Sequence, residues 1–94
     1  MPDYKVAHLN EGGQNMIIVP LDNSMTHMPL ASQQAVQADL QAHISASGLA
    51  GIVVPVWDAG GGRMSYLAPA AWHPFFDRAT LAWVVANLNR EVRW

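Results

Sequence analysis

Four side chains with useful chemistry follow two apolar stretches of this 94-residue sequence that nearly repeat one another. The stretch Ile-Ile-Val-Pro-Leu ends at Asp22, with His27 shortly after it. The stretch Ile-Val-Val-Pro-Val-Trp ends at Asp58, with Arg63 shortly after it. A histidine can act as a general base near neutral pH, an aspartate can orient its imidazole, and an arginine can hold an anion. These four residues are therefore the candidates for catalysis or ligand binding.

Ordinary turn chemistry is the alternative for the same residues, and we favour it. Asp22 can accept a hydrogen bond from the backbone of its own turn, with His27 a solvated loop residue. The three glycines before Arg63 could turn their amides toward an anion. A phosphate-binding loop, however, leads into a helix, whereas these glycines lead into another predicted strand. A hairpin turn is the better interpretation of that segment.

Metal binding has weaker support than either interpretation. Met25, His27 and Met28 are ligand types that suit Cu(I), but methionines near a strand end usually fill gaps in a core. The chain has no cysteine, which excludes a zinc–thiolate site. Asp39 and His43 are four residues apart on a predicted helix and are expected to form a weak ion pair. We therefore expect neither a metal nor a cofactor.

Aromatic side chains near the carboxyl end are a second kind of candidate. A helix predicted to begin at His73 buries an aliphatic stripe, and its aromatic residues lie roughly opposite that stripe. They either pack under their own segment and the first helix, or form an interface with a partner, where aromatic residues are enriched. The predicted interface residues are Trp72, Phe75, Phe76, Trp83 and Trp94.

Four strands are predicted to position these residues. Residues 4–9 and 16–21 flank a glycine-containing turn and form an antiparallel hairpin. Residues 52–57 form a third strand, and residues 63–67 a fourth strand that pairs back on the third. Pro55 lies inside the third strand and cannot donate to a neighbour, so a bulge or a break in pairing is expected there.

Two helices complete the predicted fold. In the first, Val36, Leu40 and Ile44 recur every four residues, and Gly48 suits the position after the helix. Ser32 is a suitable N-cap, although Leu30 and Ala31 could extend the helix backwards. Its side chains expected to face outward are Gln33, Gln34, Gln37 and Gln41. The second helix runs from His73 to the carboxyl end, where Arg90 and Arg93 suit the helix dipole. Its predicted inward stripe is Leu81, Val84, Val85, Leu88 and Val92.

The resulting order, β-β-α-β-β-α, predicts an α/β protein of the α+β two-layer type. A right-handed crossover gives a four-stranded mixed sheet with two helices packed on one face, in a single compact domain of residues 1–94. The parallel second and third strands bring the 22–29 and 58–63 loops to one edge, where ligands usually bind in such sheets. We attribute the near-repeat of the two strands to the few residue types that buried parallel strands use, rather than to duplication.

Charge excludes some function classes. Only 13% of the residues are charged, and the formal net charge is −2. Five Lys and Arg residues are too few for a surface that binds duplex nucleic acid. Single-strand binding through Tyr4, Tyr66 and Trp57 ranks last for the same reason. No signal peptide or membrane-spanning segment is visible, so we expect a cytoplasmic protein that does not bind membranes.

The sequence thus supports two functions. A sparsely charged surface that carries tryptophans tends to associate, which favours a protein-interaction module that binds itself, most simply as a homodimer, or another protein. The alternative is a small-ligand or enzymatic site at the edge formed by the 22–29 and 58–63 loops.

Overall fold

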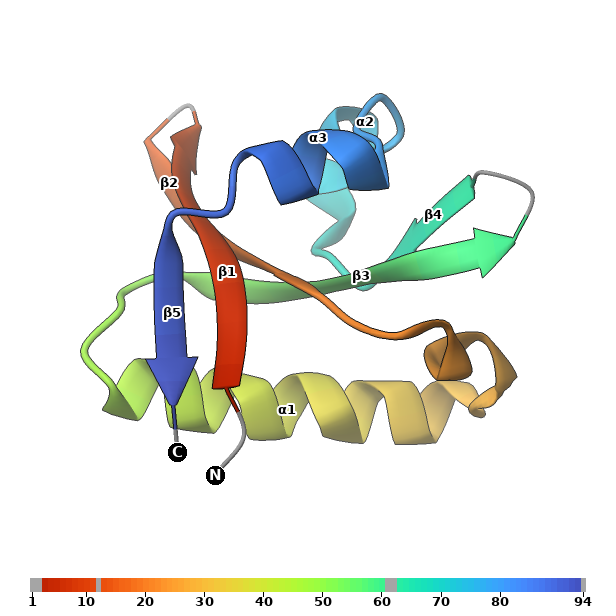
Figure 1. The fold of residues 1–94 in the computed structure, drawn as a ribbon, viewed down its shortest axis with the longest axis horizontal. Coiled ribbons are helices and arrows are strands. Elements are labelled where there is room, and N and C mark those ends of the chain that lie inside the picture. The colour runs from red at the N-terminus through yellow and green to blue at the C-terminus, as the bar shows by residue number, and fades with distance from the viewer. Residues whose placement is uncertain (1–2, 12, 61–62, 94) are drawn as a thin grey trace.

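The computed structural model describes residues 3–11, 13–60 and 63–93. Five strands form one mixed sheet in the order β4-β3-β2-β1-β5. Helix α1 covers one face of this sheet, and α2 and α3 lie over the other (Figure 1). Along the chain the elements are β1 (Asp3–Glu11), β2 (Gln14–Pro20), the 3-10 helix η1 (Asn23–His27), α1 (Leu30–Ala46), β3 (Ile52–Gly60), β4 (Arg63–Tyr66), the 3-10 helix η2 (Ala70–Trp72), α2 (His73–Phe76), α3 (Leu81–Ala86) and β5 (Arg90–Arg93).

The predicted fold class is confirmed, and the pairing of its first four strands is as expected. β1 and β2 are antiparallel, β2 and β3 are parallel, and β3 and β4 are antiparallel. The sheet has five strands rather than four because residues 90–93 form β5, which pairs antiparallel with β1. The first helix begins at Leu30, and Gly48 after it has a φ of 96°, as its place behind the helix predicts.

The prediction of one long helix from His73 to the carboxyl end is wrong. α2 and α3 are separate short helices, and Asn89 carries the chain into β5. The Asn89 side chain substitutes for a strand residue: the His8 N–H donates to its Oδ1 at 2.9 Å, and its Nδ2 donates to the His8 carbonyl at 3.0 Å. Arg90 and Arg93 therefore lie on a strand, where no helix dipole acts on them.

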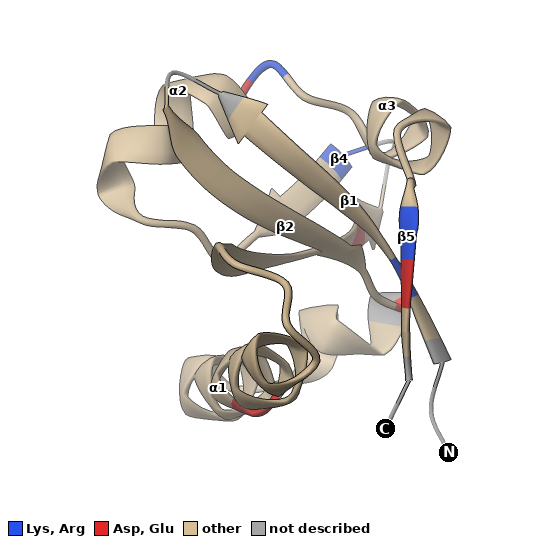
Figure 2. Ribbon diagram, turned by 90° about the vertical axis from the view of Figure 1, so that its left-hand side faces the viewer, with Lys and Arg blue, Asp and Glu red and all other residues tan. Residues whose placement is uncertain are grey.

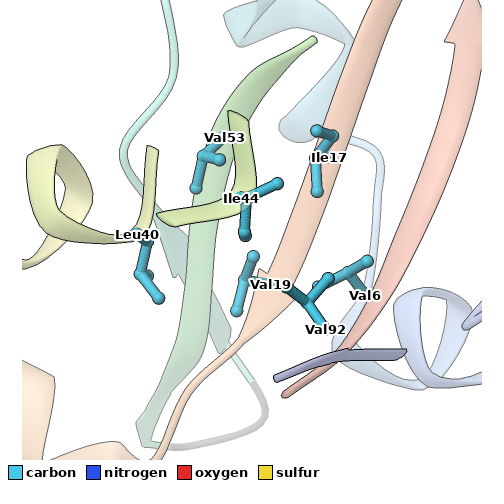
Figure 3. Packing of buried hydrophobic residues seen from close by; sticks show 7 residues of the cluster. All are labelled: Val6, Ile17, Val19, Leu40, Ile44, Val53 and Val92. Carbon is cyan, nitrogen blue, oxygen red and sulfur yellow. The ribbon is translucent and has the colours of Figure 1, made fainter. Parts of the chain in front are cut away.

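The expectation that both helices share one face is also wrong. Ile17 and Val53 point to the α1 side, while their neighbours Ile18 and Val54 point to the opposite side, and all four are fully buried. Two adjacent strands that are apolar on both faces require a cover on each. The α1-side cluster, shown in Figure 3, consists of Val6, Ile17, Val19, Leu40, Ile44, Val53 and Val92. The opposite cluster consists of Ala7, Met16, Ile18, Val54, Val56, Phe76 and Val84.

Pro55 is accommodated without a bulge at its own position. Its carbonyl accepts from the Leu67 N–H at 3.1 Å, so its missing N–H points toward the side of β4. The β3–β4 pairs begin one residue later, at Val56 and Tyr66. The proline therefore lies opposite the end of β4, where its missing N–H removes one bond from the end of the ladder.

Three of the four glutamines of α1 are half-buried and bonded to the backbone of other segments, contrary to the prediction that they face outward. The Gln33 Nε2 donates to the Met25 carbonyl at 2.7 Å, which ties the start of the helix to η1. Gln37 and Gln41 are also half-buried and bonded to the backbone, whereas Gln34 is exposed as predicted.

Gln37 and Gln41 cover the edge of β3 that β4 leaves open. The Val53 N–H donates to the Gln41 Oε1 at 2.8 Å, and the Gln37 Nε2 donates to the Val53 carbonyl at 3.1 Å. The Gln41 Nε2 also donates to the Gly51 carbonyl at 3.0 Å. Because buried backbone groups must be paired, the two side chains act here in place of a missing strand.

Replacing Gln41 with alanine tests this role. The Gln41→Ala change leaves the Val53 N–H and the Gly51 carbonyl without their partners, and we expect it to lower the free energy of unfolding by about 1–3 kcal/mol. Urea denaturation measures the change. Gln34→Ala on the exposed face is the matched control and should alter stability by less than about 0.5 kcal/mol. Equal effects of the two substitutions would contradict the assigned role.

Candidate functional site

The 3-10 helix η1, which follows β2, lies against the carboxyl end of β3, as the parallel pairing predicts. Asp58 itself lies within β3, which runs to Gly60, and not on the loop predicted over residues 58–63. The Thr26 hydroxyl donates to the Asp58 carbonyl at 3.4 Å. Each aspartate, however, binds its own turn: Asp22 accepts from the Ser24 N–H, and Asp58 accepts from the Gly60 N–H, both at 2.8 Å. The bonds from Ser24 hold the pKa of Asp22 below its ordinary value. This is the turn chemistry described above as the alternative.

His27 is the exposed last residue of η1, and Arg63 is the exposed first residue of β4. Within the described residues, no hydrogen bond or ion pair joins any two of the four candidate side chains. Two of the potential copper ligands also differ in setting, because Met25 is 3% exposed and packs inside the protein whereas His27 faces solvent. The described residues contain no cluster of three or more His, Cys, Asp or Glu side chains that could hold a metal ion. Asp39 and His43 form the expected exposed pair, 3.4 Å apart on α1.

A hollow of about 510 Å³ lies on the other side of the sheet, between α2 and α3. Two half-buried aromatic rings form part of its wall, and they meet edge to face with centroids 5.6 Å apart. The lining residues are Pro74, Phe75, Arg78, Ala79 and Trp83. The hollow therefore combines an apolar wall with one cation.

Tyr66 fixes the orientation of α2. Its hydroxyl donates to the Asp77 Oδ1 at 2.6 Å, and its ring packs against that of Phe76 at 5.2 Å between centroids. The His73 ring meets Tyr66 edge to face at 5.4 Å, and its Nε2 lies 3.1 Å from the Ala68 carbonyl. These contacts anchor one side of α2 to β4, so that Phe75 on the other side contributes to the hollow.

Thr80 fixes the start of α3 and with it the place of Trp83. The Thr80 Oγ1 accepts from the Trp83 N–H at 3.1 Å, which is an N-cap. At the other end the Asn87 Nδ2 donates to the Trp83 carbonyl at 2.8 Å. Thr80 is a local signal for a second helix start, and the prediction of a single helix did not use it.

The predicted interface residues differ in their exposure and surroundings. Phe75 and Trp83 line the hollow, and Trp72 is half-buried beside the core. Phe76 is not an outward residue, because it is 1% exposed and belongs to the core. Trp94 lies outside the described residues.

The predicted inward stripe is wrong at two positions, Val85 and Val92, because Val92 lies on β5 and packs on the α1 side of the sheet. Val84 is fully buried as expected, but Val85 is 55% exposed. Both residues lie in α3, where adjacent side chains point about 100° apart, so the short helix that packs on the core through Val84 turns Val85 toward solvent.

Arg78 is the one charged residue of the hollow and was not among the sequence-based candidates. It is exposed, and no hydrogen bond or ion pair holds its guanidinium within the described part of the chain. Its neighbour Asp77 is bonded to Tyr66. Charged residues are sparse over the fold, and the stretch between α2 and α3 carries one of each sign (Figure 2).

Comparison of the chain with models of protein families, with curated proteins and with solved structures finds no match. Among the described residues, no helix has the length and apolar character that crossing a bilayer requires. What the chain binds must therefore be inferred from its own side chains.

Alkaline titration tests the anchor of α2. The hydrogen bond to Asp77 raises the pKa of Tyr66 to about 12, from an ordinary value of 10.0. Because the unfolded chain loses this proton more readily, the stabilisation is complete below pH 10 and disappears as the pH rises toward 12. Ultraviolet titration of the phenolate should show that Asp77→Asn lowers this pKa, whereas Asp39→Asn, which removes an equal charge from α1, leaves it unchanged. A Tyr66 pKa that is insensitive to Asp77→Asn would contradict the anchor.

Proposed function

We propose that this chain is a protein-interaction module whose docking site is the hollow between α2 and α3. The observation that carries the proposal is the open wall formed by Phe75 and Trp83. Large aromatic side chains and arginine dominate the binding energy of protein interfaces, and they act best in a pocket that excludes water. A partner that inserts an apolar side chain against the two rings would remove their remaining exposed surface from water, at a gain of roughly 25 cal/mol per Å².

The alternative, a small-ligand or enzymatic site at the 22–29 and 58–63 loops, has less support. Asp22 and Asp58 are each occupied by a backbone N–H of their own turn. Catalysis by a general base requires a second group within hydrogen-bonding distance of it or of the substrate. No contact on the described loops links His27 to such a group. The hollow is therefore the better-supported site.

Selection from a library of displayed random peptides tests the docking role. We expect the wild-type chain to enrich peptides with a large apolar residue, because such a side chain can cover the exposed surface of the Phe75 and Trp83 rings. Trp83→Asp and Pro74→Glu, which place a carboxylate in its wall, should each reduce binding of the selected peptides at least about tenfold. Leu30→Asp is the control, because it also places a carboxylate at an exposed apolar residue. Leu30 is 59% exposed and lies on α1, which covers the other face of the sheet.

The amide spectrum of each variant shows whether it is folded, and Pro74 is exposed, so its replacement removes no core contact. If no peptide is enriched, or if the selected peptides bind Trp83→Asp and Pro74→Glu as well as they bind the wild type, the docking role is wrong.

Sedimentation velocity shows whether the partner is a second copy of the chain. A homodimer is the simplest interaction that the sequence suggests. If a second copy is the partner, the wild type should change from monomer to dimer with increasing concentration, and Trp83→Asp should remain monomeric while Leu30→Asp behaves like the wild type. The size must be compared for folded variants only. A dimer that persists in Trp83→Asp would place the self-association elsewhere on the chain.

A further inference from the structure

We propose that the segment that docks in the hollow is acidic and belongs to a different protein: it places an apolar side chain against Phe75 and Trp83 and a neighbouring carboxylate on Arg78. This inference rests on the proposed function and adds the chemistry of the partner. It makes Arg78 the residue that determines specificity.

The setting of Arg78 supports an anionic partner. Its guanidinium has no bonded partner within the described residues, although it lies at a wall that is otherwise apolar. The nearest acidic residue in sequence, Asp77, already accepts the Tyr66 hydroxyl. A guanidinium presents paired N–H donors that match a carboxylate, and a nearby apolar wall strengthens the pair by displacing water. A lysine-flanked anchor would instead meet like charge.

Two observations disfavour a second copy as the source of this segment. The large apolar side chains that the described chain exposes are Leu30, Ile52 and Val85, and none has an acidic residue within two positions in sequence. A symmetric contact that places hollow on hollow would also bring two copies of Arg78 together. An isologous dimer through this site therefore lacks the charge complementarity that a foreign acidic segment supplies.

Three heptapeptides with blocked ends test the proposal. Each has a phenylalanine at its centre and glycine at its four outer positions. The two residues next to the phenylalanine are both glutamate, both glutamine or both lysine. Amide chemical-shift titration of the full chain measures the dissociation constant of each at the hollow. We expect the glutamate peptide to bind roughly three- to tenfold more tightly than the glutamine peptide, and the lysine peptide to bind most weakly.

Two variants with equal changes in charge identify the cation responsible. Arg78→Gln should remove the preference for the glutamate peptide over the glutamine peptide. Arg63→Gln, on the β3–β4 hairpin, should retain the preference. Raising the salt concentration should reduce the preference in the wild type because the pair is exposed to solvent.

The outcomes separate this proposal from the function on which it rests. Equal binding of the three peptides at the hollow would overturn the acidic partner and leave the docking role intact. A preference that persists in Arg78→Gln would overturn the role of Arg78. If no peptide shifts the amides of the hollow, the proposal of an acidic segment is contradicted. The library selection then decides the docking role independently. A dimer that Trp83→Asp abolishes would assign the hollow to a second copy of the chain.

Discussion

The structure depends on one constraint: β2 and β3 lie side by side and are apolar on both faces. Ile17, Ile18, Val53 and Val54 are fully buried, and they point alternately to the two sides of the sheet. Burying each such side chain stabilises the fold by roughly 1.5–3 kcal/mol, but only if something covers it. A sheet with one open face would lose about half of this stabilisation. The chain therefore needs α1 on one side and the α2–α3 layer on the other.

The two covering layers differ in how they meet the sheet. α1 is long, and besides its apolar residues it uses Gln37 and Gln41 to pair the backbone of Val53 and Gly51. These bonds fill the position that a longer β4 would otherwise take. The α2–α3 layer consists of helices of four and six residues, which are too short to be stable alone. It depends on the core contact of Phe76 and on the caps and side-chain bonds at its ends.

Much of this fold could be predicted from local sequence, and the exceptions share one cause. The hairpin, the parallel pair and α1 follow from periodicity and turn residues that lie close together in the chain. The spacing of residues 81–92 also fits a helix, but the bonds between Asn89 and His8 join residues 81 positions apart and direct residues 90–93 into the sheet. No local pattern contains that information, and none shows that a glutamine will bond to a distant strand.

The candidate site illustrates the same limit. The sequence correctly places Asp22 and Asp58 at one edge, because strand direction alone decides this, although Asp58 lies within β3 and not on a loop. It also selected Phe75 and Trp83, but it grouped them with Phe76, which faces the core. Which of two adjacent phenylalanines points inward depends on how α2 is rotated about its axis, and the contacts of Tyr66 with Asp77 and Phe76 fix that rotation.

The short α2–α3 layer contains the proposed binding site and also covers one face of the sheet. α1 pairs its inward polar groups with the sheet, whereas α2 and α3 leave an aromatic wall and the cation of Arg78 open to solvent. The backbone of Trp83 supplies both the N–H that Thr80 caps and the carbonyl that Asn87 holds, so the residue at the centre of the wall also orders its helix. A ligand that binds only the folded arrangement stabilises that arrangement by mass action. Occupation of the hollow should therefore strengthen the layer that contains it, and with it the cover that the apolar face of β2 and β3 requires.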